Sequence, residues 1–507
     1  MSLVMKETHA RSGAFDVKEI GTILEIRQMI VRLKGLPSCA FCQPLLFPGG
    51  IKGMVIGFDK DIVEALVFGE VSGLKSGDSV TSRTESLKVP VGGAYVGRIV
   101  NGLGVACDGR QDIKPDDAMP LFAEAPGMTE RAPLSRQFFT GTNILDAVIP
   151  IAKGQRELIV GDRMTGKTTL AMDAILNQKG KDVVCIYCCI GRSYDFLLKM
   201  ILLLQSRGAL GYSIVVASTA DAPVGEQYLA PYTAATIGEH LMRQGRDVLV
   251  VFDDMTKHAW VYRQISLLMD RSPGREAYPG DIFYVHSQLV ERAAQLKPEL
   301  GGGSMTFLPI VETLQGDLTG YISSNLVSMT DGQIYLSSDL FKEGFKPAID
   351  LGLSVSRIGN KIQSPALRSL AATLRLEYVK YKELLNVSKL RSSVSKEAQA
   401  KLKRGQAISE ILKQGKNEPV DAIEQIILLV VLKKGSLDEL SGALIAKFKK
   451  TFYSFLMDYY PALLKALRTE MTITESIRKE IDAATVEFFK SQAGEPKRAS
   501  AKETPAP

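Results

Sequence analysis

The sequence of 507 residues lacks any hydrophobic run long enough to cross a membrane. Its longest aliphatic run, Ile426 to Leu432, is followed directly by Lys433 and Lys434 and is far shorter than the ~20 residues that a spanning helix needs. Residues 1–13 also lack the apolar core of a secretory signal. We therefore expect no membrane-spanning segment and a protein that stays in the compartment where it is made.

A strong charge of either sign is missing as well. Lys and Arg number 62 against 56 Asp and Glu, which gives a net charge of +6. This excess is too small over such a length to favour a nucleic-acid-binding protein. Residues 1–90 also lack a dense set of aromatic side chains on which bases could stack. We predict no nucleic-acid partner.

Cysteine is scarce, with six residues in the whole chain. Without a secretory context these are expected to be reduced thiols. Cys39 and Cys42 have the spacing of a metal-binding or redox pair, but no second pair lies at the distance that a zinc site requires. A structural role is therefore the favoured interpretation of these two residues.

What is present is the composition of an ordinary folded protein. Hydrophobic residues make up 45% and charged residues 23%, which excludes a wholly disordered, collagen-like or coiled-coil chain. The length predicts about two to four domains.

The first domain is predicted to be a small antiparallel β-barrel, because short β-rich runs alternate there with glycine-containing turns. Pro90 and the pair Gly92 and Gly93 mark its end. We therefore assign residues 1–20 to an N-terminal arm and residues 21–92 to the barrel. The expected strands are Thr22 to Leu33, Met54 to Phe58, Ala65 to Val71 and Ser79 to Thr81.

Residues 93–364 are predicted to form an α/β nucleotide-binding domain. Continuous apolar strands separated by helical stretches indicate a parallel sheet that helices cover on both faces. The expected strands are Glu157 to Val160, Val183 to Tyr187, Ser213 to Ala217, Val248 to Phe252 and Met305 to Val311.

Residues 365–490 are predicted to form a helical domain. Apolar residues from Leu367 to Leu385 follow the spacing of one helix face, which indicates core packing rather than a cofactor site. Residues 491–507 are rich in small, charged and proline residues and are expected to be a disordered tail.

A phosphate-binding loop follows the strand that ends at Val160. The pattern is Gly, four residues, then Gly-Lys-Thr, with an apolar helical run directly after it. The glycines let backbone N–H groups face the phosphates, and the helix N-terminus adds partial positive charge. Lys167 is expected on the β- and γ-phosphates and Thr168 on Mg²⁺. The predicted ligands are ATP or ADP with Mg²⁺, and the predicted contacts are Arg163, Met164, Thr165, Gly166, Lys167, Thr168 and Thr169.

A second acidic contact for the metal is expected at the end of the strand Val248 to Phe252, which is followed by Asp253 and Asp254. An aliphatic strand that presents a carboxylate at the carboxyl edge of the sheet is the Walker B arrangement. We predict that Asp253 and Thr168 are the residues on the metal side.

Several segments closely resemble the α subunit of F-type ATP synthases. These are residues 154–163, 262–268, 273–281, 291–294, 301–304, 330–334 and 352–357, and the resemblance extends from about residue 21 to about residue 489. It implies the three-part architecture of that family: an N-terminal β-barrel, a central RecA-like P-loop domain and a C-terminal α-helical domain.

The resemblance also implies partners and a place in the cell. The expected assembly is a head of alternating α and β subunits around the central-stalk γ subunit, with δ and b subunits in the peripheral stalk. Proton or sodium flow through the membrane sector would drive ATP synthesis on β. The expected place is the cytoplasmic face of a bacterial-type inner membrane, as a peripheral component, or the inner face of an organellar membrane.

Individual site residues follow from the same resemblance. It places Phe341, Gln414 and Lys416 at the nucleotide base and Arg357 as an arginine finger that reaches the β site, with Ser354 in the same interface loop. The sequence departs from the family pattern at Met164 and Lys416, where the family has Gln, and at Lys346, where it has Arg.

The chain itself is predicted to be non-catalytic and regulatory. Hydrolysis needs a carboxylate to activate water beside the γ-phosphate. Catalytic relatives carry Glu at a position that is Arg192 here, and a guanidinium cannot act as a base. The alternatives are a catalytic RecA-like ATPase, such as a β subunit or an export ATPase, and an RNA translocase of the Rho type.

Overall fold

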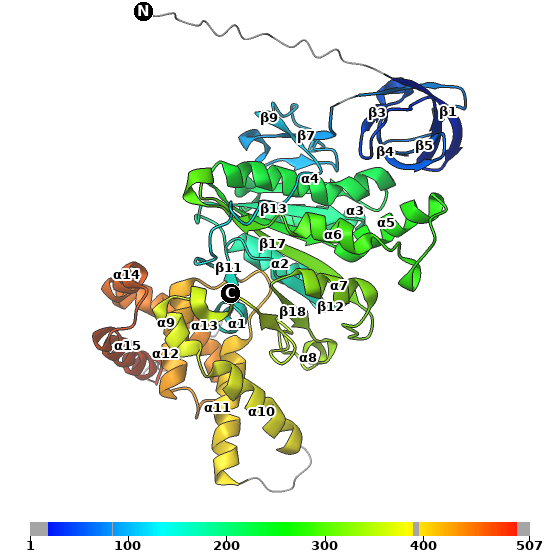
Figure 1. The fold of residues 1–507 in the computed structure, drawn as a ribbon. Helices are drawn as coiled ribbons and strands as arrows, with labels where there is room; N and C mark the ends of the chain where they lie inside the picture. The colour runs from blue at the N-terminus through cyan, green and yellow to red at the C-terminus, as the bar shows by residue number, and fades with distance from the viewer. Residues whose placement is uncertain (1–18, 84, 389–394, 494–507) are drawn as a thin grey trace, which may run out of the picture.

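The computed structural model describes residues 19–83, 85–388 and 395–493. The predicted arm, apart from residues 19 and 20, and the tail from residue 494 lie outside the described residues. Three bodies follow one another along the chain: a β-barrel, a central sheet domain and a helical domain (Figure 1). None of the described helices is long and apolar enough to cross a membrane.

The barrel is closed and has six antiparallel strands in the order β1-β2-β5-β4-β3-β6. Side chains alternate between its interior and the neighbouring domain: Val55 lies in the barrel core, whereas Met54 and Ile56 join the core of the sheet domain. The strands are β1 (Ile20–Arg27), β2 (Ile30–Lys34), β3 (Pro44–Leu46), β4 (Lys52–Asp59), β5 (Ile62–Val67) and β6 (Ser79–Ser82).

Two expectations for this region are wrong. The run Thr22 to Leu33 is two strands, because the chain reverses at Gln28 and Met29 and Gln28 adopts a left-handed backbone with φ 52°. The barrel also ends at Ser82 rather than at residue 92. Because β1 pairs with β6, no free edge remains for β7 (Lys88–Val91), which pairs with β9 (Asp117–Pro120) in a separate small sheet.

The central domain has a nine-stranded sheet in the order β19-β18-β12-β17-β15-β13-β14-β8, with β16 paired to β17. The inner strands are parallel, as expected, but β16 (Ala294–Gln295) and β19 (Val355–Ser356) are antiparallel, so the sheet is mixed. The other strands are β8 (Ile99–Val100), β12 (Leu158–Asp162), β13 (Val183–Ile190), β14 (Ser213–Ser218), β15 (Asp247–Asp253), β17 (Ser304–Thr313) and β18 (Gly332–Leu336).

Helices cover both faces of this sheet, and β13 shows how its residues divide between them. Cys185, Tyr187 and Cys189 face one apolar core, whereas Val184 and Ile186 face the other. On the first face lie α1 (Asn143–Val148), α2 (Lys167–Leu176) and α3 (Tyr194–Ser206). On the second lie α4 (Val224–Arg243), α5 (Met255–Leu268), α6 (Ile282–Val290) and α7 (Tyr321–Met329). Smaller elements are α8 (Ser338–Lys342) and the pair β10 (Gln137–Phe138) and β11 (Ile151–Ala152).

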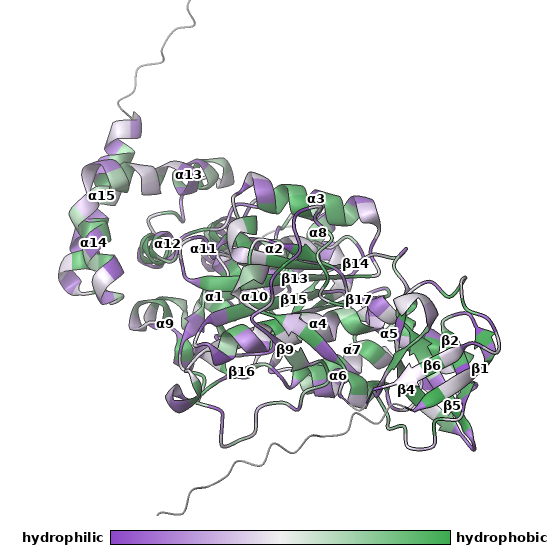
Figure 2. Ribbon diagram, turned by 90° about the horizontal axis from the view of Figure 1, so that it is seen from above, coloured by the Kyte–Doolittle hydropathy of each residue, from purple (hydrophilic) through white to green (hydrophobic). Residues whose placement is uncertain are grey.

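The helical domain packs onto the first face of the sheet domain, opposite the barrel (Figures 1 and 2). Its core is α12, in which every residue from Gln425 to Leu432 is buried, so the longest aliphatic run of the sequence lies inside a domain. The helices are α9 (Pro365–Ala371), α10 (Leu374–Ser388), α11 (Lys396–Leu412), α12 (Ala422–Lys434), α13 (Gly442–Tyr459), α14 (Pro461–Glu470) and α15 (Glu475–Ala493).

The apolar stripe from Leu367 to Leu385 crosses a break between α9 and α10, so it lies on two helices rather than one. The periodicity survives the break because both helices bury that side in the same core. The last helix continues to Ala493, so residues 491–493 are helical and do not belong to a disordered tail, whereas the rest of that predicted tail lies outside the described residues.

Candidate nucleotide-binding site

The phosphate loop lies between β12 and α2, as the sequence predicts. Gly166 is the N-cap of α2 and has a left-handed backbone with φ 100°. Gly161 passes so close to strand β18 that a Cβ there would lie 2.5 Å from the Leu336 carbonyl oxygen. The chain can turn sharply here because neither position carries a side chain.

The loop is held by internal hydrogen bonds of Asp162 and Lys167. The Asp162 carboxylate accepts from the Thr313 hydroxyl at 2.7 Å and from the Ser338 hydroxyl at 2.9 Å. Lys167 is buried, and its Nζ donates to the carbonyl oxygens of Gly161 at 2.8 Å and of Asp162 at 2.6 Å. Burial lowers the pKa of this ammonium. An anionic phosphate placed in the loop would meet an immobilised positive charge.

Thr168 and Asp253 meet at the start of α2. The Thr168 hydroxyl donates to Asp253 Oδ2 at 2.6 Å, and the Tyr187 hydroxyl donates to the same oxygen at 3.0 Å. Hydroxyl and carboxylate oxygens are the ligands that Mg²⁺ prefers, so Thr168 and Asp253 are of the right chemical type for a nucleotide-bound Mg²⁺. Both carboxylate oxygens of Asp253, however, already accept hydrogen bonds from the protein. Within the described chain, no group of three or more His, Cys, Asp or Glu side chains is arranged to hold a metal alone. Nucleotide phosphates would therefore have to complete the coordination shell.

Arg192 lies between the carboxylates at this edge of the sheet. Its Nε and Nη2 donate to Asp253 Oδ1 at 3.1 and 2.7 Å, and its Nη1 donates to Glu312 Oε1 at 3.0 Å. Nη2 also lies 2.9 Å from Asp254 Oδ2. Burial disfavours the charged guanidinium, but the surrounding carboxylates outweigh it and raise its pKa. Burial raises the pKa of Asp254 to about 7, although Arg192 opposes that rise.

Glu312 and Tyr187 also belong to this cluster, although no sequence motif predicted them. Glu312 follows the expected strand Met305 to Val311, and its neighbour β15 ends in Asp253. Because parallel strands bring their carboxyl ends to one edge, this position was a signal that could have identified Glu312. Nothing comparable in the sequence marks Tyr187, which lies inside a buried strand.

A cavity of about 780 Å³ begins at the phosphate loop and ends at the helical domain. Its size is in the range of sites that hold small ligands and cofactors. Asp173 of α2, Arg192, Glu312 and Lys346 also line it. It brings together all the residues predicted to contact the nucleotide: Arg163, Met164, Thr165, Gly166, Lys167, Thr168, Thr169, Phe341, Gln414 and Lys416.

At the far end of the cavity, Gln414 is held by hydrogen bonds within the protein. Its amide oxygen accepts from the Asn143 backbone N–H at 3.1 Å, and its amide nitrogen donates to the carbonyl oxygens of Gly141 at 2.8 Å and Glu418 at 2.7 Å. Both amide N–H groups are thus used within the protein, and one acceptor position remains for a base. At the same end, Lys346 Nζ lies 4.5 Å from the centre of the Phe341 ring, a cation–π contact.

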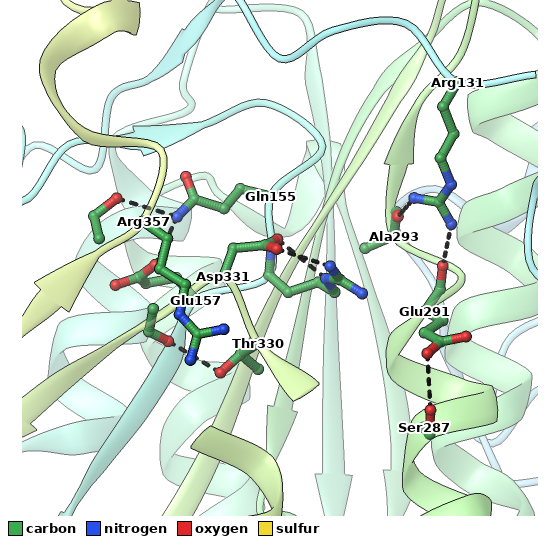
Figure 3. A network of polar contacts seen from close by, with 12 residues as sticks. Arg131, Gln155, Glu157, Ser287, Glu291, Ala293, Thr330, Asp331 and Arg357 are labelled. Atoms are coloured by element: carbon green, nitrogen blue, oxygen red, sulfur yellow. Dashed lines mark hydrogen bonds and ion pairs between the residues drawn. The ribbon is translucent and has the colours of Figure 1, made fainter. Parts of the chain in front are cut away.

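Arg357 and Ser354 lie outside this cavity, near β19. Arg357 is exposed, its backbone N–H donates to the Asp331 carbonyl at 2.8 Å, and Figure 3 shows its side chain beside Glu157 and Asp331. Ser354 is fully buried, and its hydroxyl accepts from the Tyr335 backbone N–H at 2.9 Å. Ser354 therefore does not present its hydroxyl at a surface, and that hydroxyl holds the loop to β18 instead.

The comparisons with known proteins agree with this geometry. Models of the ATP synthase alpha/beta family match residues 16–83 (beta-barrel domain), 141–356 (nucleotide-binding domain) and 363–488 (C terminal domain). A protein named ATP synthase subunit alpha from Clostridium botulinum (strain Eklund 17B / Type B) is 43% identical over 489 residues, which cover 96% of this chain and 97% of that protein. The protein of the same name from Dehalococcoides mccartyi (strain CBDB1) is 42% identical over the same shares of the two chains. The chain therefore belongs to the ATP synthase alpha/beta family.

Proposed function

We propose that the chain is the non-catalytic, regulatory α subunit of an F-type ATP synthase, which binds ATP or ADP with Mg²⁺ in the cavity between the phosphate loop and Phe341. The relatives reported above carry the name of that subunit and match over nearly their whole length. Lys167 would bind the β- and γ-phosphates, and Thr168 would contact Mg²⁺, which neutralises phosphate charge when bound. Asp253, the second residue predicted on the metal side, is already bound by Arg192, Thr168 and Tyr187.

The observation that carries the non-catalytic assignment is the environment of Arg192. At the position where catalytic relatives have a Glu, its guanidinium is fixed between Asp253, Asp254 and Glu312. Glu312, which also lines the cavity, is ion-paired with Arg192 and is therefore not free to activate water.

A bound nucleotide would contact two domains at once. Its phosphates would bind the start of α2 in the sheet domain, whereas its base would lie against the segment from Gln414 to Lys416, which belongs to the helical domain. Occupancy of the cavity would thereby stabilise the packing of the helical domain on the sheet domain. This is a regulatory effect that needs no hydrolysis.

The proposed complex contains β, the central-stalk γ subunit and the peripheral-stalk δ and b subunits. It would contact the membrane through its membrane sector, at the cytoplasmic face of a bacterial-type inner membrane, and would use a proton or sodium gradient. In this complex Arg357 would extend across the interface to the γ-phosphate in the β site, where a guanidinium stabilises the charge of the transition state. Its exposure at the edge of the domain supports this role.

Co-expression with a β subunit and γ tests the proposal. We expect the chain to co-purify with β in equal amounts, to bind ATP alone, and to show no turnover alone. Lys167→Ala should abolish nucleotide binding by this chain while the complex still assembles. If the pure chain hydrolyses ATP and Lys167→Ala abolishes that activity, the chain is instead a catalytic ATPase. Retention of single-stranded RNA on a filter would favour an RNA translocase.

A further inference from the structure

We propose that Arg192 is a built-in cation that makes nucleotide binding at this site nearly independent of Mg²⁺. The inference rests on the proposed function, because it concerns the same cavity. It goes further in one respect: the carboxylate that would serve the metal in other P-loop sites is already bound by the protein's own guanidinium.

Asp253 has no acceptor position left. A carboxylate offers about four lone-pair sites. Its Oδ1 accepts two N–H groups from Arg192, and its Oδ2 accepts the hydroxyls of Thr168 and Tyr187. Water bound to a metal ion could reach this carboxylate only by displacing one of these four contacts.

Arg192 cannot easily move away from these carboxylates. Its side chain is only 15% exposed, and its guanidinium carbon lies 5.2 Å from the centre of the Phe196 ring. Its backbone carbonyl accepts from the Ala220 N–H at 2.8 Å, which fixes the end of β13. A displaced guanidinium would also leave the carboxylates of Asp254 and Glu312 without their shared ion pair.

The cavity already holds a fixed cation where phosphates would bind. Arg192 lines the cavity together with Lys167 and Thr168. Nε, Nη2 and one hydrogen of Nη1 are used by the carboxylates, which leaves the second Nη1 hydrogen for a phosphate oxygen. The site thus supplies positive charge to the nucleotide from the protein, where a site with a free Walker B carboxylate relies on the metal.

The test is calorimetric titration of ATP into the full-length chain with excess Mg²⁺ or with EDTA. We expect the two dissociation constants of the natural chain to agree within about threefold. Arg192→Gln frees Asp253 and removes the fixed cation. Because hydrogen bonds to charged groups are typically worth enough to change an equilibrium by tenfold or more, Mg²⁺ should tighten ATP binding by at least ~10-fold in this variant.

Arg478→Gln removes the same charge from the exposed side of α15 and is the matched control, which should behave as the natural chain. If Mg²⁺ tightens ATP binding to the natural chain by tenfold or more, the inference is overturned, whereas the proposed nucleotide site still stands. This comparison needs no variant. An equal response to Mg²⁺ in Arg192→Gln and the natural chain would overturn it as well. No binding of ATP under either condition would remove the proposed site itself.

Discussion

Asp173 is a carboxyl group that the fold keeps out of water in the middle of α2. It is buried, and burial raises its pKa to about 7, with partial compensation from the Asn417 backbone N–H. In the unfolded chain an Asp has a pKa near ~3.9. Between these two values the folded state binds the proton and the unfolded state does not, so stability falls as pH rises through this window.

We therefore predict that Asp173→Asn removes a pH-dependent loss of stability. The variant should gain unfolding free energy over the natural chain, and this gain should be larger at pH 8 than at pH 5 by an amount on the order of 2 kcal/mol. Differential scanning calorimetry without nucleotide measures this. Asp195→Asn, which changes an exposed carboxyl in the first turn of α3, is the control. A parallel pH profile for Asp173→Asn and the natural chain would contradict the prediction.

The proposed role of Arg357 at the β site predicts how its substitution changes the activity of the assembled complex. Arg357→Ala should leave assembly and nucleotide binding by this chain intact, because the residue is exposed and does not line the cavity. Steady-state ATPase activity of the complex should fall by ~10³ or more, the contribution of arginine fingers elsewhere. Arg357→Lys should restore little, since an ammonium does not reproduce the planar guanidinium. Activity within a few-fold of the natural complex for either variant, with Arg478→Ala as control, would remove Arg357 from the mechanism.

Sequence patterns described the phosphate loop better than the far end of the cavity. The phosphate loop works through backbone geometry, which a local glycine pattern encodes. The side chains of Gln414 and Ser354 are held by hydrogen bonds to residues that are distant in sequence. Gln414 accepts from the Asn143 backbone N–H, and Ser354 accepts from the Tyr335 backbone N–H. Periodicity and motif spacing carry no information about such contacts, so both side chains appeared freer than they are.

Helices α10 and α11 form a pair whose contact depends on a glycine. A Cβ at Gly405 of α11 would lie 2.1 Å from the Cγ and Cδ2 atoms of Tyr381 on α10. Those atoms are at the base of the ring and cannot swing aside without moving the helix. The sequence predicted the apolar stripe that includes Tyr381, but the glycine opposite it follows only from the packing.

We predict that Gly405→Ala destabilises the chain despite the higher helix propensity of alanine. Overpacking should cost ~1–3 kcal/mol, against a propensity gain of at most ~1 kcal/mol. The midpoint of thermal unfolding should therefore fall, whereas Gly280→Ala, where no atom lies within 4 Å of the new Cβ, should leave it unchanged. In a Tyr381→Ala background, Gly405→Ala should become neutral or stabilising. If it remains equally costly there, the ring contact is not the cause.

The three bodies of the molecule are joined by apolar contacts that the sequence did not reveal. The outer face of β4 and β5 packs on the second core of the sheet domain, and the Arg271 guanidinium donates to the Ile56 carbonyl at 2.9 Å across that junction. The helical domain shares the first core. Local turns and periodicity predicted that three domains exist, but they placed the end of the barrel too late, because strand closure is a property of the whole sheet.

The positions of the cysteine side chains allow the unfolding of the natural chain to be followed by alkylation of its thiols. Cys107 is exposed, whereas Cys185, Cys188 and Cys189 on β13 are buried, and burial raises the pKa of each of these three thiols. An alkylating reagent attacks the thiolate, so the β13 thiols would be modified only in molecules whose sheet has opened. Cys185 and Cys189 face one helical layer and Cys188 faces the other. Mass spectrometry of alkylated peptides over time would thus show which layer separates first, with no engineered label.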